Sequence, residues 1–268
     1  GVIYAKRKKS TDAILSYEQS IKYNPNNRDA LINLGSIYLE NKDYHKAKKI
    51  FEKAINLQPL DSRLYHNLGV VFTRLNIFEE AIESYLKAQK LNSKNPLTYY
   101  NLGYLLTKKF KIKESINNYK EAIKLDSTNE KFYYNLALAE TELGKYFSAI
   151  TNFRRAISIF NDYETAKYNL ARLNLATENF SDGWKDYEKR HYQNQNNIPQ
   201  RLKNVLNFKQ WNGKKFDGTL YVHGEQGIGD LILHSSMILD LYKIQNNICL
   251  SVDDRLVSLF RRSFKKIN

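Results

Sequence analysis

A glycine-rich run near the C-terminus has the composition of a binding loop. It reads Gly224-Glu225-Gln226-Gly227-Ile228-Gly229-Asp230. The residues before it, 219–223, are β-branched and aromatic and predict a buried strand, and 231–242 predict a helix. Glycines at such a turn expose backbone N–H groups, which favour a negatively charged group. The spacing matches neither the dinucleotide fingerprint nor the phosphate-binding loop of nucleotide hydrolases.

The polar residues around this run have simple structural explanations. Asp230 directly precedes the expected helix and is suited to cap its N-terminus. His223 and Glu225 fit structural roles better than catalytic ones. No group of His, Cys and acidic residues has metal-ligand spacing, and no order of Ser, His and Asp indicates a nucleophilic triad. The sequence therefore predicts no metal site.

A second set of polar side chains recurs at a fixed interval of 34. The set consists of five asparagines: Asn33, Asn67, Asn101, Asn135 and Asn169. A side-chain amide offers two donor hydrogens and an acceptor oxygen, so a row of them suits the backbone of a peptide whatever its sequence. The alternative is that these asparagines bond neighbouring helices or face water. The residues alone leave both interpretations open.

The same interval of 34 governs the apolar residues. Each asparagine is followed by leucine and then by a small residue: Gly35, Gly69, Gly103, Ala137 and Ala171. Apolar spacings of three and four predict helices, and Pro59 and Asn-rich turns interrupt them. The small residues allow close helix approach, while Tyr38 and Phe51 fill wider gaps. One helical hairpin cannot bury its apolar face alone, but stacked hairpins share a continuous core. The pattern predicts a mainly α solenoid.

The repeat register places Gly1 inside the first helix of a repeat, since it lies one repeat interval before Gly35. We therefore expect a truncated first repeat and a natural protein that extends upstream. The predicted organisation is a repeat array of about six copies at 1–192, a connector at 193–205, and an incomplete α/β segment at 206–268.

The repeated pattern of Leu-Gly, aromatic, Ala, aromatic, Ala and Pro resembles the tetratricopeptide repeat (TPR) family over about residues 1–192. The resemblance implies a superhelix whose concave groove, lined by the first helix of each pair, takes peptides or protein segments. The asparagine column is similar to the ladder of the O-linked N-acetylglucosamine transferases, which lines the groove that carries their protein substrates. On this basis the five asparagines are the candidate peptide-binding residues.

The C-terminal part resembles a different family. Residues 211–214, Trp-Asn-Gly-Lys, and the glycine-rich run are similar to bacterial proteins that join TPRs to a heptosyltransferase-like glycosyltransferase of the GT-B type. The resemblance implies a partial Rossmann-like segment, Asp230 as the general base, and an acceptor loop formed by Gly224, Glu225, Gln226, Gly227 and Gly229. It also implies a nucleotide-sugar donor for the full-length parent. The donor-binding half is missing here, so we expect no cofactor in this fragment and no transferase activity.

Two functions follow from these resemblances. The first is an interaction scaffold from a TPR-containing glycosyltransferase, whose repeats bind a protein or peptide partner or acceptor. The alternative is a pure adaptor without a catalytic role, in which the C-terminal segment is a degenerate cap.

Composition narrows the partners and the compartment. The net charge of +14 would suit nucleic acid, but the basic residues are dispersed along a chain that is rich in Lys throughout, which disfavours that partner. No apolar stretch reaches the roughly 20 residues that a membrane span needs. The single cysteine, Cys249, cannot form an internal disulfide, so the sequence predicts a reducing, cytoplasmic setting.

Overall fold

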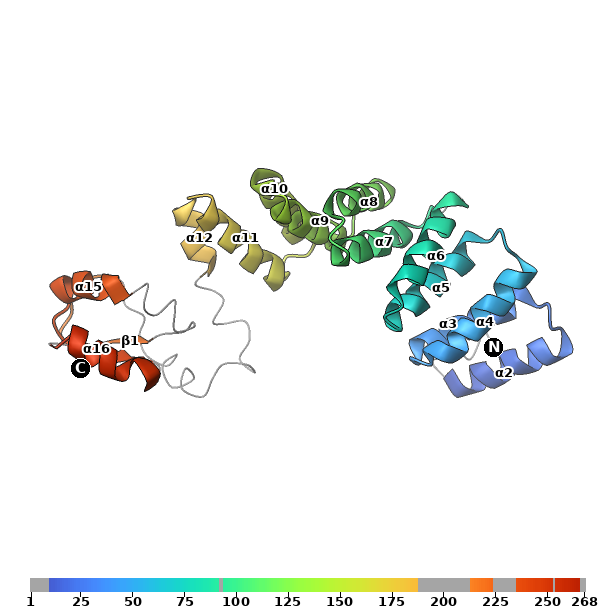
Figure 1. The fold of residues 1–268 in the computed structure, drawn as a ribbon, viewed down its shortest axis with the longest axis horizontal. Coiled ribbons are helices and arrows are strands. Elements are labelled where there is room, and N and C mark those ends of the chain that lie inside the picture. The colour runs from blue at the N-terminus through green and yellow to red at the C-terminus, as the bar shows by residue number, and fades with distance from the viewer. Residues whose placement is uncertain (1–9, 92–93, 188–212, 224–234, 253, 266–268) are drawn as a thin grey trace. The chain divides into compact units, whose positions relative to one another are not determined.

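The computed structural model describes residues 10–91, 94–187, 213–223, 235–252 and 254–265. The chain divides into two compact units, residues 1–195 and 196–268 (Figure 1). Each unit has a core of its own and is described separately.

The first unit is a succession of antiparallel helix pairs, in which each helix packs on the next (Figure 1). After α2 (Ser10–Tyr23), the first helices of the pairs are α3 (Arg28–Glu40), α5 (Ser62–Arg74), α7 (Pro96–Lys108), α9 (Glu130–Glu142) and α11 (Glu164–Ala176). The second helices are α4 (Tyr44–Leu57), α6 (Phe78–Lys90), α8 (Ile112–Leu125), α10 (Tyr146–Ile159) and α12 (Phe180–Tyr187). The mainly α solenoid expected from the repeat period is confirmed.

Four of the five first helices, α3, α5, α7 and α9, begin at side-chain caps that recur with the repeat. The capping residues are Asn27, Asp61, Asn95 and Asn129, and each side chain accepts a hydrogen bond from a backbone N–H of the helix that it precedes. These caps satisfy donors that have no partner within the helix. The turns between repeats are therefore encoded locally.

The turns inside the helix pairs share a left-handed backbone conformation. The positive φ angles recur once in each repeat, at Lys42 (64°), Asn76 (60°), Phe110 (59°), Gly144 (70°) and Glu178 (63°). Glycine adopts this conformation without steric cost, whereas a side chain with a Cβ is disfavoured in it. Gly144 suits this conformation best and Asn76 tolerates it, whereas Lys42, Phe110 and Glu178 are disfavoured in it.

Close helix contacts inside each pair depend on the small residue of the repeat. A Cβ added to Gly35, Gly69 or Gly103 would lie 2.7, 2.7 or 2.8 Å from the nearest ring carbon of Phe51, Tyr85 or Tyr119. Each of these rings is at most 1% exposed. The glycines therefore let the two helices of a pair close on a buried aromatic ring, as the sequence predicts.

The second unit contains two short parallel strands, β1 (Leu220–His223) and β2 (Ile248–Ser251), with Leu220 opposite Ile248. The 3-10 turn η2 (Ser235–Met237) and α15 (Ile238–Ile244) lie between them in the chain, and η3 (Asp254–Leu256) and α16 (Val257–Ser263) follow β2. Ile238, Leu256 and Phe260 form the core. Strand β1 lies within residues 219–223, where the sequence predicts a strand. The described residues contain these two strands and no larger sheet, so a Rossmann-like domain is not observed.

Candidate functional site

Helices α7 to α11 surround a pocket of about 630 Å³, here named the α7–α11 pocket. Its walls come from both helices of successive pairs and from the turn after α7. It is lined by Tyr104, Thr107, Lys108, Phe110, Tyr119, Asn135, Leu138, Thr141, Glu142, Tyr146, Phe153, Asn169, Arg172, Leu173 and Ala176. The volume is within the range of natural ligand sites.

Two of the five repeated asparagines lie in this pocket and form the same contacts. The Asn135 Nδ2 group donates to the Lys131 carbonyl oxygen at 2.9 Å and to the Tyr100 hydroxyl at 3.2 Å. One repeat later, Asn169 Nδ2 donates to the Thr165 carbonyl oxygen at 3.0 Å and to the Tyr134 hydroxyl at 3.1 Å. Because a carbonyl can only accept, the first contact in each pair fixes which end of the amide is nitrogen.

These contacts use both hydrogens of each amide, while Oδ1 accepts no hydrogen bond from the described part of the chain. The N–H groups of both asparagines are thus used inside the repeat array, in bonds to their own helix and to a tyrosine of the preceding repeat. The Oδ1 atoms of these two pocket-lining residues therefore remain available as acceptors. A ligand that uses them must donate hydrogen bonds, as the backbone N–H groups of a peptide do.

The other three asparagines, Asn33, Asn67 and Asn101, are half-buried and do not line the α7–α11 pocket. The difference arises in the preceding repeat. Tyr100 and Tyr134 contact the asparagines 35 residues later, whereas the residues 35 before Asn67 and Asn101 are Ile32 and His66. Neither offers a phenol, so the contact with a residue 35 positions earlier cannot form there, and Asn101 instead forms a side-chain hydrogen bond with Tyr85.

The phenols of Tyr100 and Tyr119 stay protonated at neutral pH. Burial raises the pKa of Tyr100 and of Tyr119 above the usual tyrosine range. The Tyr119 hydroxyl lies 3.3 Å from Thr107 Oγ1, and its ring packs against Gly103. Each phenol is therefore a neutral group that can donate and accept hydrogen bonds.

The pocket lining also contains charged and exposed aromatic side chains. Lys108 lies 5.6 Å from the ring centre of Tyr104, and Arg172, Glu142 and Lys108 supply charges of both signs. Tyr104, Tyr146 and Phe110 are 40%, 42% and 87% exposed. Interfaces are enriched in aromatic residues and arginine, so this rim is suited to contact with another protein.

The sequence alone did not single out Phe110. A signal for it was available, because aligning the turns at the repeat interval places Phe110 where the next repeat has Gly144.

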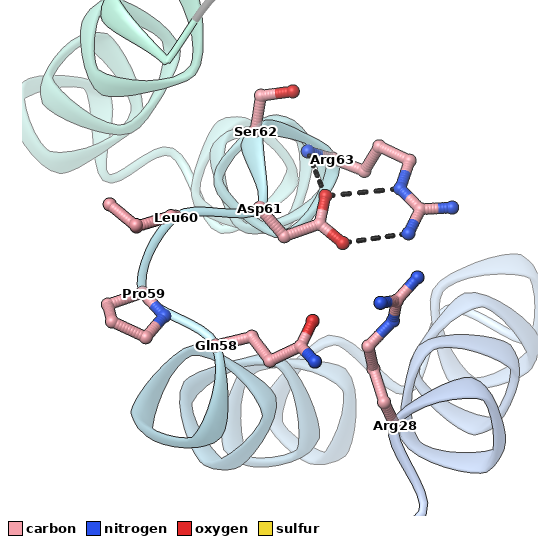
Figure 2. A pocket seen from close by; sticks show the side chains of 7 residues that line it. All are labelled: Arg28, Gln58, Pro59, Leu60, Asp61, Ser62 and Arg63. Carbon is pink, nitrogen blue, oxygen red and sulfur yellow. Dashed lines mark hydrogen bonds and ion pairs between the residues drawn. The ribbon is translucent and has the colours of Figure 1, made fainter.

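A second pocket, of about 550 Å³, lies at the turn between α4 and α5 (Figure 2). Its lining residues are Arg28, Gln58, Pro59, Leu60, Asp61, Ser62 and Arg63. The Asp61 carboxylate accepts hydrogen bonds from Arg63 Nη2 at 2.8 Å and Nε at 3.1 Å. It also accepts one from the backbone N–H of Arg63 at 3.0 Å. The hydrogen bond from the Arg63 side chain lowers the pKa of Asp61. Because Asp61 and Arg63 satisfy each other while capping α5, this pocket is explained by the structure of the turn.

The candidate catalytic residue Asp230 and the candidate acceptor-loop residues Gly224, Glu225, Gln226, Gly227 and Gly229 lie outside the described residues. Within the described residues no group of three or more His, Cys, Asp or Glu side chains could hold a metal ion. Among the described helices, none combines the length and the apolar character needed to cross a membrane.

Stacked helix pairs with a recurring turn and a shared core define an α-solenoid built from helical repeats. Family models of the tetratricopeptide repeat match residues 4–69 and 130–163, and a TPR repeat model matches 71–109 and 106–140. Together these matches extend over more than half of the chain. The chain belongs to the tetratricopeptide repeat family.

Solved structures support the same fold. PilW, described as a widely conserved type IV pilus biogenesis factor, is 19% identical with a TM-score of 0.63, over 76% of this chain and 94% of PilW. YrrB, described as a TPR protein with an unusual peptide-binding site, is 18% identical with a TM-score of 0.60, over 70% of this chain and 97% of YrrB. MamA of Desulfovibrio magneticus RS-1 is 14% identical with a TM-score of 0.58, over 64% of this chain and 97% of that protein. No curated protein sequence matches the chain.

Proposed function

We propose that the chain is a scaffold that holds an extended peptide segment of another protein in the α7–α11 pocket. The observation that carries this proposal is that Asn135 and Asn169, whose amide oxygens accept no hydrogen bond from the described residues, line one pocket with an exposed aromatic rim. Since both amides are held by bonds to their own helix and to the preceding repeat, their oxygens are oriented before a ligand arrives. Such preorganisation reduces the entropy lost on binding.

The proposed binding mode is recognition of the peptide backbone. Peptide N–H groups donate to the two amide oxygens, and the aromatic rim contacts the peptide side chains. Backbone contacts provide affinity without reading sequence, so the rim and the charged groups provide selectivity. YrrB, which shares the fold, is described as having a peptide-binding site, and this supports the class of ligand.

Replacing both asparagines tests this proposal. A net hydrogen bond contributes about 1 kcal/mol, so the double variant Asn135→Ala/Asn169→Ala should bind a peptide about 30-fold more weakly. The probe is the tightest peptide selected by the wild-type chain from a random library of peptides of about 12 residues, which span roughly 40 Å when extended. Affinity is measured by titration calorimetry, and circular dichroism monitors folding.

The matched control is Asn33→Ala/Asn67→Ala, which alters the same column outside the pocket and should leave affinity unchanged. Equal affinity of the wild-type chain and the folded Asn135→Ala/Asn169→Ala variant would remove the asparagines from the binding site.

The second unit favours a further candidate function for a longer parent protein. The strands β1 and β2 are parallel and are connected through helical residues, the arrangement from which doubly wound sheets are built. With the resemblance of the glycine-rich run, this supports a nucleotide-sugar-dependent glycosyltransferase of the GT-B type, with Asp230 as base and the loop residues at the acceptor. The family matches end at residue 163, so this candidate depends on the second unit alone.

Activity of the full-length parent tests this candidate. If Asp230 is the base, Asp230→Ala should abolish sugar transfer while nucleotide-sugar binding persists. Normal turnover by this variant would remove Asp230 as the base, whereas no sugar transfer by the wild-type protein would leave the adaptor function. We place either protein in the cytoplasm, since the single thiol, Cys249, suits a reducing compartment.

A further inference from the structure

Phe110 occupies a backbone conformation that disfavours its side chain. It follows α7 with a φ of 59°, at the turn position that is glycine one repeat later, Gly144. A bulky side chain in the left-handed region has a steric cost that glycine does not have. The fold therefore provides no local reason for a phenylalanine here.

Packing provides no reason either. The Phe110 side chain is 87% exposed, and among the corresponding turn residues it is the only aromatic one. Burial of an aromatic ring is a large favourable contribution, and Phe110 obtains little of it within the described part of the chain. Its ring nevertheless lines the α7–α11 pocket. A residue that is both strained and exposed at the edge of a pocket is best explained by contact with a ligand.

Lysines surround this phenylalanine. Residues 108–113, here named the Phe110 turn, read Lys-Lys-Phe-Lys-Ile-Lys, and all four lysines are exposed. Lys109 forms an ion pair with Glu79, and Lys111 lies 3.9 Å from Glu114. Lys108 and Lys113 form no ion pair with a described residue, so the turn keeps a positive charge around its aromatic ring.

We propose that the Phe110 turn is a docking anchor that selects acidic peptide segments with an apolar side chain. In this arrangement the apolar side chain packs on Phe110, while flanking carboxylates contact the lysines. The inference deepens the proposed function and rests on it, because the same peptide runs into the α7–α11 pocket. An anionic membrane surface would also suit phenylalanine among lysines. However, Asn135 and Asn169 line the same pocket as Phe110, and their unused amide oxygens favour a ligand with N–H donors.

The variant Phe110→Gly separates binding from folding. Glycine relieves the backbone strain, so the midpoint of urea denaturation should rise, while the affinity for the selected peptide should fall at least about tenfold. Lys42→Gly is the matched control, because it makes the same change at the corresponding turn far from the pocket. It should also raise the midpoint, and it should leave peptide affinity unchanged.

Selectivity is tested with the same random peptide library. Peptides selected by the wild-type chain should be enriched in Asp and Glu next to an aromatic or aliphatic residue, and those selected by Phe110→Gly should lose this enrichment. Unchanged affinity and enrichment with Phe110→Gly would overturn the anchor. If Asn135→Ala/Asn169→Ala still weakened binding, the proposed function would survive that result.

A membrane role is the other outcome that the experiment distinguishes. Vesicles of phosphatidylcholine with phosphatidylserine serve as the probe. The membrane role predicts that the wild-type chain sediments with these vesicles, that Phe110→Gly does not, and that no peptide is selected from the library. This combined result would overturn both the anchor and the proposed function. Peptide binding without sedimentation supports both.

Discussion

Tyr119→Ala should destabilise the repeat unit by about 3–5 kcal/mol, the cost typical of deleting a large buried aromatic ring. The Tyr119 ring is 1% exposed and lies against Gly103, whose missing Cβ leaves the space that the ring fills. Removing it opens a cavity between α7 and α8 and deletes part of the wall of the α7–α11 pocket. Urea denaturation followed by circular dichroism measures the effect.

The matched control is Tyr119→Phe. It removes only the hydroxyl contact with Thr107, at 3.3 Å, and should cost about 1 kcal/mol or less. The chain itself shows that this substitution is compatible with the fold, because Phe51 and Phe153 occupy the equivalent positions in other repeats. Equal stability of Tyr119→Ala and Tyr119→Phe would contradict the close packing described for this pair.

Acidification should destabilise the repeats through His66. Burial lowers the pKa of His66 to about 4 from an ordinary value of 6.5, so between these values the unfolded chain binds a proton that the folded chain does not. Stability is therefore unaffected by this group above pH 6.5 and falls as the pH decreases towards 4. At about 1.4 kcal/mol per pKa unit, the loss amounts to about 3 kcal/mol.

The variant His66→Asn isolates this contribution from the titration of carboxyl groups. Its side-chain amide can occupy the place of Nδ1, which lies 2.8 Å from Thr98 Oγ1, but it does not titrate. Urea denaturation of both proteins at pH 7 and pH 4 should show a larger loss of stability for the wild-type chain, by about 3 kcal/mol. If both proteins lost the same stability between pH 7 and pH 4, the folded chain would bind a proton at His66 as readily as the unfolded chain does, which would contradict the lowered pKa.

The sequence predicts the repeats well because their information is local. Small residues such as Gly69, caps such as Asn95 and the apolar spacing recur at the repeat interval, so each copy strengthens the prediction for the others. The strands at Leu220 and Ile248 are similarly encoded by short apolar runs. The expected boundary at residue 192 and the connector at 193–205 remain predictions.

The binding pocket was harder to predict because it depends on contacts between repeats. Five asparagines are equivalent in sequence, but only Asn135 and Asn169 lie in the α7–α11 pocket, where tyrosines of the preceding repeat hold them. The direction of their amides, which leaves the oxygens as acceptors, follows from those contacts and not from residue type. The sequence alone did not single out Phe110, although its alignment with Gly144 at the repeat interval was a signal, and the positive φ of the turn shows why that signal matters.

A crystal structure of the chain with a peptide selected from the random library tests the central claim most directly. Our account predicts an extended peptide in the α7–α11 pocket, with backbone N–H groups about 2.9 Å from Asn135 Oδ1 and Asn169 Oδ1. A peptide bound elsewhere, for example at the pocket of Arg28 and Arg63, would contradict it.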